Sequence, residues 1–207
     1  LPFRQAVRQD GQWRERVVGL HPEDETRFAF HTGPAIAPDD PFIPAGLTDS
    51  PEGTLIELRP GDAQIVDLLA ARFARHPGHA LFIDYGPAMS EPGDTLQAIA
   101  GHQKVDPLAA PGTADLTARV DFETLARRAL AAGLQVHGPL EQGAFLKGLG
   151  IEQRAASLSA SRPDQRAVIA RQLHRLCDNS QMGALFKVIA ISAAGMPAPP
   201  GLPAFAG

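Results

Sequence analysis

The stretch ALFIDYG, residues 80–86, is the one around which the rest of the chain is organised. Four apolar residues run directly into Asp84, Tyr85 and Gly86, and an apolar run without alternation is typical of a strand buried on both faces, as in a parallel sheet. The polar triplet would lie at the carboxyl end of that strand, where open α/β sheets bind ligands. Asp84 and Tyr85 are therefore the first candidates for chemistry, although Asp84 as a simple turn residue fits the pattern equally well.

The composition is that of a soluble globular protein with a core of its own. The chain has 207 residues, 44% of them hydrophobic, which predicts one domain or a domain with a small annex. No apolar run reaches the ~20 residues of a membrane-spanning helix, and residues 1–4 do not have the pattern of a signal peptide. The formal charge of −4 argues against nucleic acid as the main partner. The single cysteine, Cys177, excludes an internal disulfide and fits a reducing compartment.

Residue patterns before this stretch predict a β-rich region. Asp10-Gly11 separates two β-prone runs, which is a strong hairpin signal over residues 3–18. Residues 21–50 are rich in proline, glycine and acids and are expected to be mostly irregular, with a short strand at 27–31, before a further strand at 53–58. From Pro60, apolar residues at helical spacing predict a helix that precedes strand 80–84, and this pair is half of an α/β repeat.

Residue patterns after this stretch predict two further strands, at 134–137 and 184–192. The second is the best candidate for a central strand because its apolar run is nearly unbroken. Helices are predicted from the N-cap Asp121 to Gly133, at 142–149, and from Pro163 to about Cys177. Residues 95–100 are expected to form a short helix and residues 103–117 an ordered loop.

The densest run of polar side chains lies between Asp94 and Asp121. Long ordered loops with few apolar residues are often functional. Asp94, Asp115 and Asp121 could simply cap turns and helices, and Asp121 is expected to do so. For His102 and Asp115 the pattern favours a functional role.

Several familiar chemical motifs are absent from the sequence. It contains no G-x-S-x-G nucleophile elbow, no G-x-x-x-x-G-K-[ST] phosphate loop and no G-x-G-x-x-G. His76 and His79 are separated by Pro77-Gly78, which breaks a helix, so a solvated loop is a better interpretation than a metal site. No metal is expected.

A set of segments occurs in an order that resembles a known family: FIDYG (82–86), GDTLQA (93–98), His102, DPL (106–108), PGTADLTARVDF (111–122), QGAFL (142–146) and MGALFKV (182–188). This order resembles the MidA-like family of S-adenosylmethionine-dependent methyltransferases. The family includes a mitochondrial complex I assembly factor that methylates an arginine of a complex I subunit. The resemblance runs from residue 1 to about residue 200.

The resemblance implies an α/β fold, namely the carboxyl-terminal half of a Rossmann-like methyltransferase sheet. Residues 80–84, 134–137 and 184–192 would be strands five, six and seven, with the last strand antiparallel between the other two. The chain would form a single partial domain, with a β-rich hairpin excursion (1–60), the sheet and its helices (61–139 and 182–194) and a helical insertion (140–181). The family's glycine-rich cofactor loop has no counterpart here, so the contacts to the cofactor are expected in a missing amino-terminal half.

The implied function is protein arginine methylation linked to the assembly of respiratory complex I, with S-adenosylmethionine as the cofactor and a protein, such as a complex I subunit, as the substrate. Because an arginine guanidinium favours carboxylates, Asp84 and Asp115 are the catalytic candidates, and Tyr85, His102 and Thr117 would bind the substrate. The alternative is a non-catalytic protein-binding module or assembly factor fragment. The expected location is the cytoplasm in a bacterium or the mitochondrion in a eukaryote.

Two expectations concern surfaces. Residues 140–181 would leave and return at the ligand edge of the sheet and form a helical lid or a substrate-docking surface. Residues 80–84 would be an exposed edge strand, which favours a homodimer through this strand unless the hairpin at 3–18 covers it.

Overall fold

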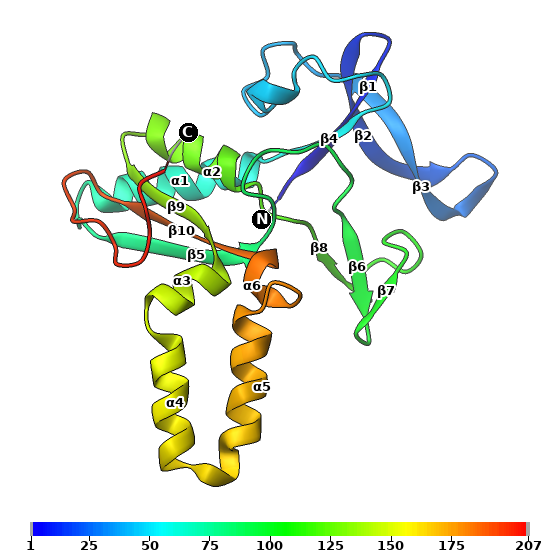
Figure 1. Ribbon diagram of the computed structural model, residues 1–207. Coiled ribbons are helices and arrows are strands. Elements are labelled where there is room, and N and C mark those ends of the chain that lie inside the picture. Colours follow the sequence, from blue (N-terminus) through cyan, green and yellow to red (C-terminus); the bar gives the residue numbers. More distant parts are fainter. Residues whose placement is uncertain (1, 206–207) are drawn as a thin grey trace. The chain divides into compact units, whose positions relative to one another are not determined.

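The protein is described by a computed structural model of residues 2–205 (Figure 1). Contacts within the chain group it into two compact units. The first contains Leu1–Ala63 and Ser90–Arg119, and the second contains Gln64–Met89 and Val120–Gly207. Each unit has a hydrophobic core of its own. That the whole chain makes up a single partial domain stays a prediction.

A four-stranded antiparallel sheet in the order β3-β2-β1-β4 is the main element of the first unit. Its strands are β1 (Arg4–Gln9), β2 (Gln12–His21), β3 (Asp24–Ala35) and β4 (Leu55–Leu58), and the short helix η1 (Ala45–Leu47) lies between the last two. The predicted hairpin is confirmed, since Asp10 and Gly11 have φ angles of 53° and 70°, as both central residues of a type I′ turn require. Ala6, Trp13 and Ile56 are the centre of its core.

A three-stranded sheet in the order β7-β6-β8 also belongs to the first unit. It consists of β6 (Gln97–Ala100), β7 (Gln103–Val105) and β8 (Asp115–Thr117). The predicted helix at 95–100 is therefore wrong, and the predicted loop at 103–117 contains two strands. These strands have only three or four residues each, too short for an apolar alternation to show, and antiparallel backbone pairing defines them.

The second unit is built on a three-stranded sheet in the order β5-β10-β9. Its strands are β5 (His79–Tyr85), β9 (Gln135–Glu141) and β10 (Phe186–Ser192). The prediction that the last strand lies between the other two and antiparallel to both is confirmed. Ile189 and Ile191 of β10 are fully buried, as expected of a central strand. The outer side of β9 is partly covered by the carboxyl-terminal segment, where Gly138 N donates to Pro203 O.

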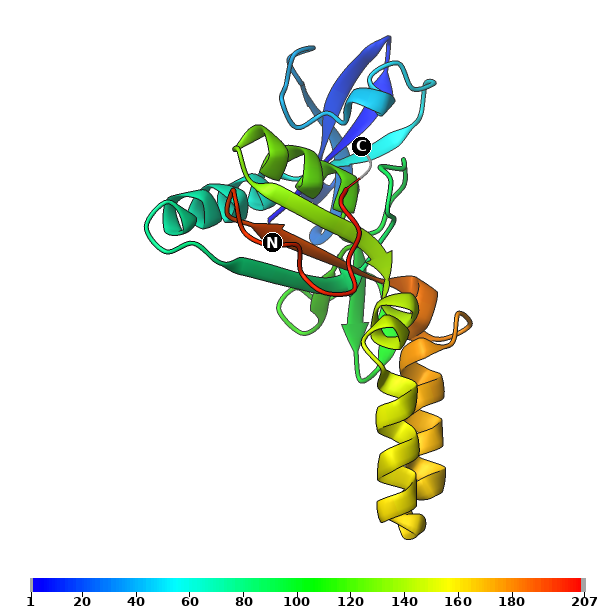
Figure 2. The ribbon, with the colours of Figure 1, turned by 60° about the vertical axis from the view of Figure 1, so that its left-hand side comes forward.

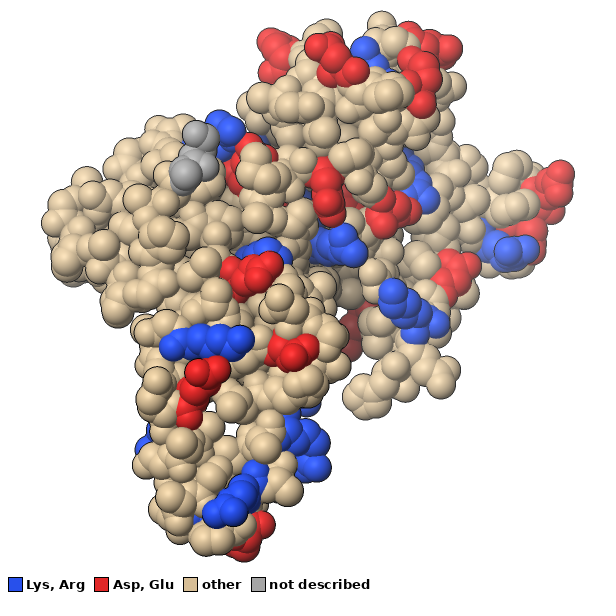
Figure 3. All heavy atoms as spheres, viewed as in Figure 1, with Lys and Arg blue, Asp and Glu red and all other residues tan. Residues whose placement is uncertain are grey.

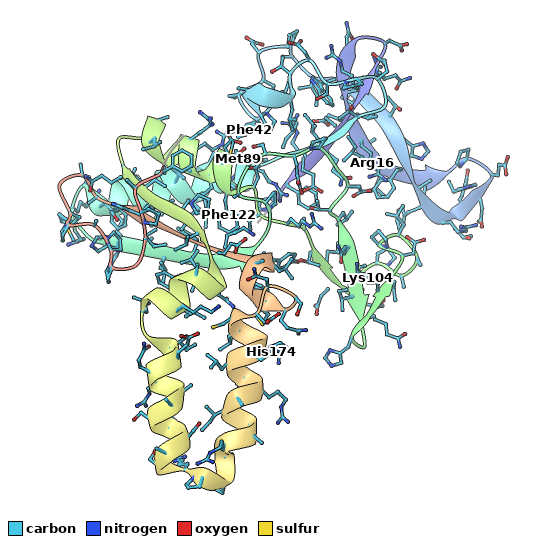
Figure 4. All side chains as sticks on the ribbon, in the orientation of Figure 1. Arg16, Phe42, Met89, Lys104, Phe122 and His174 are labelled. Atoms are coloured by element: carbon cyan, nitrogen blue, oxygen red, sulfur yellow. The ribbon has the colours of Figure 1, made fainter. Side chains whose placement is uncertain are left out.

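Helices α1 (Pro60–Phe73) and α2 (Phe122–Ala131) supply the core on one face of this sheet. Phe122, labelled in Figure 4, is fully buried there together with Ile189 and Ile191. Asp121 caps α2 as predicted, since its carboxylate accepts hydrogen bonds from Thr124 N and Thr124 Oγ1, both at 2.9 Å. The packed apolar faces of α1 and α2 account for the position of β5 and β10 beneath them.

The opposite face of this sheet is only partly covered. Phe145 and Leu202 pack against Val188 and Ala190 of β10. Along β5, however, Leu81 is 52% exposed and Ile83 46% exposed. The prediction that residues 80–84 are buried on both faces is therefore wrong: only the face that carries Ala80 and Phe82 packs against the core.

A helical hairpin leaves the sheet between β9 and β10. It contains α3 (Gln142–Gly148), α4 (Ile151–Ser161), η2 (Pro163–Gln165), α5 (Arg166–Cys177) and α6 (Met182–Leu185). The α4 and α5 helices run side by side and extend away from the three strands, as the two ribbon views show (Figures 1 and 2). No described residue of α4 is buried, and Cys177 is the buried residue of α5. None of the helices within residues 2–205 is both long and apolar enough to cross a membrane.

Candidate active site

The carboxyl end of β5 presents the first two predicted site residues together. Asp84 is exposed, and its Oδ1 atom accepts a hydrogen bond of 2.8 Å from the backbone N–H of Tyr85. Tyr85 is half-buried, and its ring packs edge-on against Phe186 of β10, with the ring centroids 5.8 Å apart. The strand therefore fixes Tyr85 by packing and leaves the Asp84 carboxylate accessible to a ligand.

Gly86 ends this strand by a close approach to the segment before α2. A Cβ atom at Gly86 would lie 2.0 Å from the carbonyl oxygen of Val120, which no side chain tolerates. The same approach allows Val120 N to donate to Tyr85 O at 3.0 Å. The glycine in the FIDYG segment is thus required to join the end of β5 to the start of α2.

Asp115 and Thr117 lie together on β8 in the other unit. Side chains two residues apart on a strand point to the same face, so these two share one face of the three-stranded sheet. The register places Asp115 opposite Ile99 and Ile99 opposite Lys104, which Figure 4 labels on β7. Asp115 is exposed and Thr117 is half-buried. This face therefore carries a carboxylate and a hydroxyl on β8 and an ammonium group on β7, with β6 between the two strands.

His102 occupies the tip of the β6–β7 hairpin. With Gly101 it forms a two-residue turn in which both residues have positive φ angles, 56° for Gly101 and 63° for His102. A type I′ turn requires a positive φ at both of its central residues, so the turn itself accounts for the φ angle of His102. The imidazole is exposed at this tip.

The predicted site residues thus form two groups, one in each unit. Asp84 and Tyr85 are adjacent on β5, whereas Asp115, Thr117 and His102 are on the three-stranded sheet. That Asp84 and Asp115 approach one another stays a prediction.

Comparison with known proteins gives the family of the chain. Residues 1–140 match the sequence profile of a family described as "Putative S-adenosyl-L-methionine-dependent methyltransferase". The chain belongs to this methyltransferase family. The matched residues include the whole of the first unit, β5 and α2, and thereby every predicted site residue.

The chain is similar in sequence to proteins that are named as arginine methyltransferases. The chain is 34% identical over 193 residues to "Protein arginine methyltransferase NDUFAF7, mitochondrial" of Mus musculus, and 35% identical over 197 residues to the protein of the same name in Danio rerio. These matches cover 92% of the chain but only 43% and 44% of the relatives. The chain therefore spans less than half the length of the curated relatives it matches.

Two solved structures resemble this chain over nearly its whole length. A crystal structure of a candidate methyl transferase from Burkholderia thailandensis, with bound S-adenosyl-homocysteine, matches with a TM-score of 0.80 and 30% identity. It covers 97% of this chain and 52% of that protein. A second structure from the same organism matches with a TM-score of 0.77 and 28% identity. The α/β methyltransferase-like fold predicted from the sequence is confirmed.

A network of buried polar side chains in the first unit was not predicted from the sequence. Glu57 and Arg59 at the end of β4 are 9% and 8% exposed, and their side chains form an ion pair. Gln5, on the neighbouring strand, is also buried, and its Nε2 atom donates to Glu57 Oε1 at 3.2 Å and to Asp94 Oδ1 at 2.9 Å. The only signal in the sequence is that Glu57 and Arg59 alternate with apolar residues within and directly after the strand predicted at 53–58. A charged residue at such a position is more often exposed.

The same network perturbs the ionisation of Asp94. Partial burial of this carboxyl group would raise its pKa, but hydrogen bonds from Arg16 and Gln5 outweigh that effect and hold the pKa below its usual value. Arg16 Nη1 donates to Asp94 Oδ2 at 2.6 Å. Asp94 is therefore charged at neutral pH and anchored to the four-stranded sheet. Its Oδ1 atom also accepts a hydrogen bond of 3.2 Å from Leu96 N, so the turn-capping role considered from the sequence is present as well.

Two cavities lie among the described residues of the first unit. A cavity of about 390 Å³ lies beside β7 and β8, lined by residues between Ala100 and Leu116, and one of about 570 Å³ lies beside Trp13. Asp84, Tyr85 and Asp115 line neither of these cavities. Within residues 2–205 no group of three or more His, Cys, Asp or Glu side chains is arranged to hold a metal ion. That the cofactor contacts lie in an amino-terminal half outside these residues stays a prediction.

Proposed function

We propose that residues 1–207 act within an S-adenosylmethionine-dependent protein arginine methyltransferase. The observation that carries this proposal is the match, over 97% of the chain, to a protein crystallised with S-adenosyl-homocysteine, which is the product left after S-adenosylmethionine gives up its methyl group. The arginine specificity rests on the names of the mitochondrial relatives, which are 34% and 35% identical. S-adenosylmethionine, when bound, supplies an electrophilic methyl group.

The residues of this chain are assigned to the methyl-accepting side. A guanidinium is positively charged at neutral pH and pairs with carboxylates through two parallel N–H donors. We assign Asp84 and Asp115 to orient this group and to accept the proton that the attacking nitrogen loses. Tyr85, His102 and Thr117 are assigned to shape the surrounding surface. Positioning of this kind supplies much of the rate enhancement when a reaction is an in-line displacement.

The finer features of the fold support the same assignment. In the proposed correspondence β5, β9 and β10 are strands five, six and seven of a methyltransferase sheet, and their order and directions agree with it. The α4–α5 hairpin is proposed as a lid or docking surface for the protein substrate. Between residues 151 and 177 it carries five Arg residues against two Asp or Glu residues, and Figure 3 shows basic side chains distributed along it. An acidic surface on the substrate would complement this charge.

Partner and compartment are proposed from the relatives. The proposed substrate is a protein, with a complex I subunit as the candidate, and the proposed assembly is a homodimer through the exposed edge of β5. A eukaryotic source would place the protein in mitochondria, as its relatives are named, and a bacterial source in the cytoplasm.

The test is an acceptor-dependent methyl transfer assay with the complete natural polypeptide that contains residues 1–207. Formation of S-adenosyl-homocysteine is measured with an arginine-containing peptide and with the same peptide carrying lysine in place of arginine. Turnover with arginine alone is the expected result. Binding of the peptide without any turnover would favour the alternative, a non-catalytic protein-binding module, and turnover with lysine would overturn the assigned specificity.

A further inference from the structure

Glu57 holds a single residue, Thr95, through two separate hydrogen bonds. Its Oε1 atom accepts from Thr95 N at 3.0 Å, and its Oε2 atom accepts from Thr95 Oγ1 at 2.7 Å. Because Glu57 is 9% exposed and also pairs with Arg59, its carboxylate has little freedom to move. The carboxylate therefore fixes both the backbone and the hydroxyl of Thr95.

The Thr95 hydroxyl also binds the segment that follows β8, the strand that carries Asp115. While it donates to Glu57, it accepts a hydrogen bond of 2.9 Å from the backbone N–H of Arg119. Thr95 comes two residues before β6, and Arg119 comes two residues after β8. The hydroxyl thus joins the beginning of β6 to the end of β8, next to the paired residues Gln97 and Thr117.

The residue before Thr95 is anchored by the same sheet. Arg16, Gln5 and Glu57 lie directly opposite one another on β2, β1 and β4. Asp94 accepts hydrogen bonds from Arg16 and Gln5, at 2.6 and 2.9 Å, while Thr95 is bound to Glu57. A row of three side chains across three strands therefore forms hydrogen bonds with two consecutive residues, Asp94 and Thr95.

From this geometry we infer that Glu57, acting through the Thr95 hydroxyl, is a positioning residue that sets the place of β8 and hence of Asp115 and Thr117. The inference rests on the proposed function for its catalytic consequence, but the anchorage itself can be tested without it. A buried ion pair is weak as a source of stability compared with apolar residues of the same volume. A fixed carboxylate with several donors is, however, well suited to hold a segment in one geometry.

The experiment compares two substitutions of similar size at one position. Thr95→Val removes the hydroxyl and keeps the shape, whereas Thr95→Ser keeps the hydroxyl. Hydrogen exchange of the Arg119 amide is measured in residues 1–207, and kcat and KM for the arginine peptide are measured in the complete polypeptide. With valine we expect Arg119 exchange to rise about tenfold and kcat to fall about tenfold, the effect of one hydrogen bond, while serine restores both.

A matched control, the loss of the Glu52 carboxylate, distinguishes the specific effect of Glu57 on Arg119 from the effect of removing any carboxylate. Glu52 also accepts two backbone N–H groups, from Asp10 at 2.9 Å and Gly11 at 2.7 Å, but at the β1–β2 turn. Glu57→Gln should accelerate exchange at Arg119, and Glu52→Gln should leave it unchanged. Unchanged Arg119 exchange in both Thr95→Val and Glu57→Gln would overturn the inference. Faster exchange at Arg119 with an unchanged kcat would overturn the positioning role of Glu57. If the wild-type polypeptide showed no methyl transfer, the proposed function would be refuted, but the exchange measurement would still decide whether Glu57 anchors this segment.

Discussion

Substitution of Gly86 by alanine tests the join between the end of β5 and the start of α2. The added Cβ atom would lie 2.0 Å from Val120 O and 2.9 Å from Val120 C and N, whereas ordinary contacts begin at 3.4 Å. Relief of the closest contact needs a displacement of 3.4 − 2.0 = 1.4 Å between two backbone segments. Such a displacement would break the hydrogen bonds from Val120 N to Tyr85 O and from Phe122 N to Pro87 O.

The expected cost is a large fraction of the stability of a domain. Two backbone hydrogen bonds contribute about 1 kcal/mol each, and overpacking adds about 1–3 kcal/mol, so the free energy of unfolding should fall by about 3–5 kcal/mol. Domains of this size are stable by about 5–15 kcal/mol. At a slope of about 2 kcal/mol per molar urea, the midpoint should fall by about 2 M.

Urea unfolding followed by far-ultraviolet circular dichroism measures this change, because most of the helix lies in the second unit. Gly78→Ala is the matched control at the other end of the same strand. Its Cβ atom would meet Phe73 at 3.8 Å, an ordinary contact, so its midpoint should stay within about 0.5 M of the wild type. If Gly86→Ala unfolds at the same urea concentration as Gly78→Ala, the close approach to Val120 does not exist in solution.

Three further predictions concern the cofactor, acid stability and self-association. Residues 1–207 alone should bind S-adenosylmethionine more weakly than micromolar, a level that corresponds to about −8 kcal/mol, and calorimetry that finds a micromolar constant would place the cofactor site in this chain. Because the pKa of Asp94 is held below its usual 3.8, this carboxylate contributes stability that is present above that pH and lost as the pH falls through the lowered value. Asp94→Asn should therefore make the midpoint of urea unfolding, followed by the fluorescence of Trp13, less sensitive to pH in that acidic range. An unchanged dependence of this midpoint on pH would contradict the hydrogen-bond network around Asp94. The exposed edge strand β5 should cause self-association, which sedimentation measures. Ile83→Lys should abolish this association, whereas Leu116→Lys, at an exposed position of the other unit, should not. Equal association of the two variants would exclude this edge as the interface.

Features with a local cause could be predicted from the sequence. The Asp10-Gly11 turn, the Asp121 cap and the unbroken apolar run of β10 each follow from properties of a few neighbouring residues. The central position of β10 was indicated both by this apolar run and by the resemblance of the ordered motifs to a known family. The exposure of Leu81 and Ile83 was missed because an apolar run gives no sign of which neighbours are present to cover it.

Features that depend on distant partners could not be predicted. The strands β6 and β8 exist because short segments pair with one another across 14 residues of intervening chain, from 101 to 114. The buried position of Glu57 depends on Gln5, Arg59 and Thr95, which come from three different segments. The sequence identified Asp84, Tyr85, His102, Asp115 and Thr117 as candidates, and whether the acids of the two units meet stays a prediction.

In the proposed function, the carboxylate of Asp84 at the end of β5 acts on the methyl acceptor. The most direct measurement is the effect of Asp84→Asn in the complete polypeptide, with kcat for the arginine peptide and the dissociation constant of S-adenosylmethionine determined on the same preparation. We expect kcat to fall roughly 100-fold, the lower range for loss of a group that accepts a proton, while cofactor affinity changes less than about twofold. Asp39→Asn, which removes an exposed acid of the first unit, should change neither quantity. Equal losses of kcat and cofactor affinity in Asp84→Asn would instead assign this residue to the cofactor and contradict the claim.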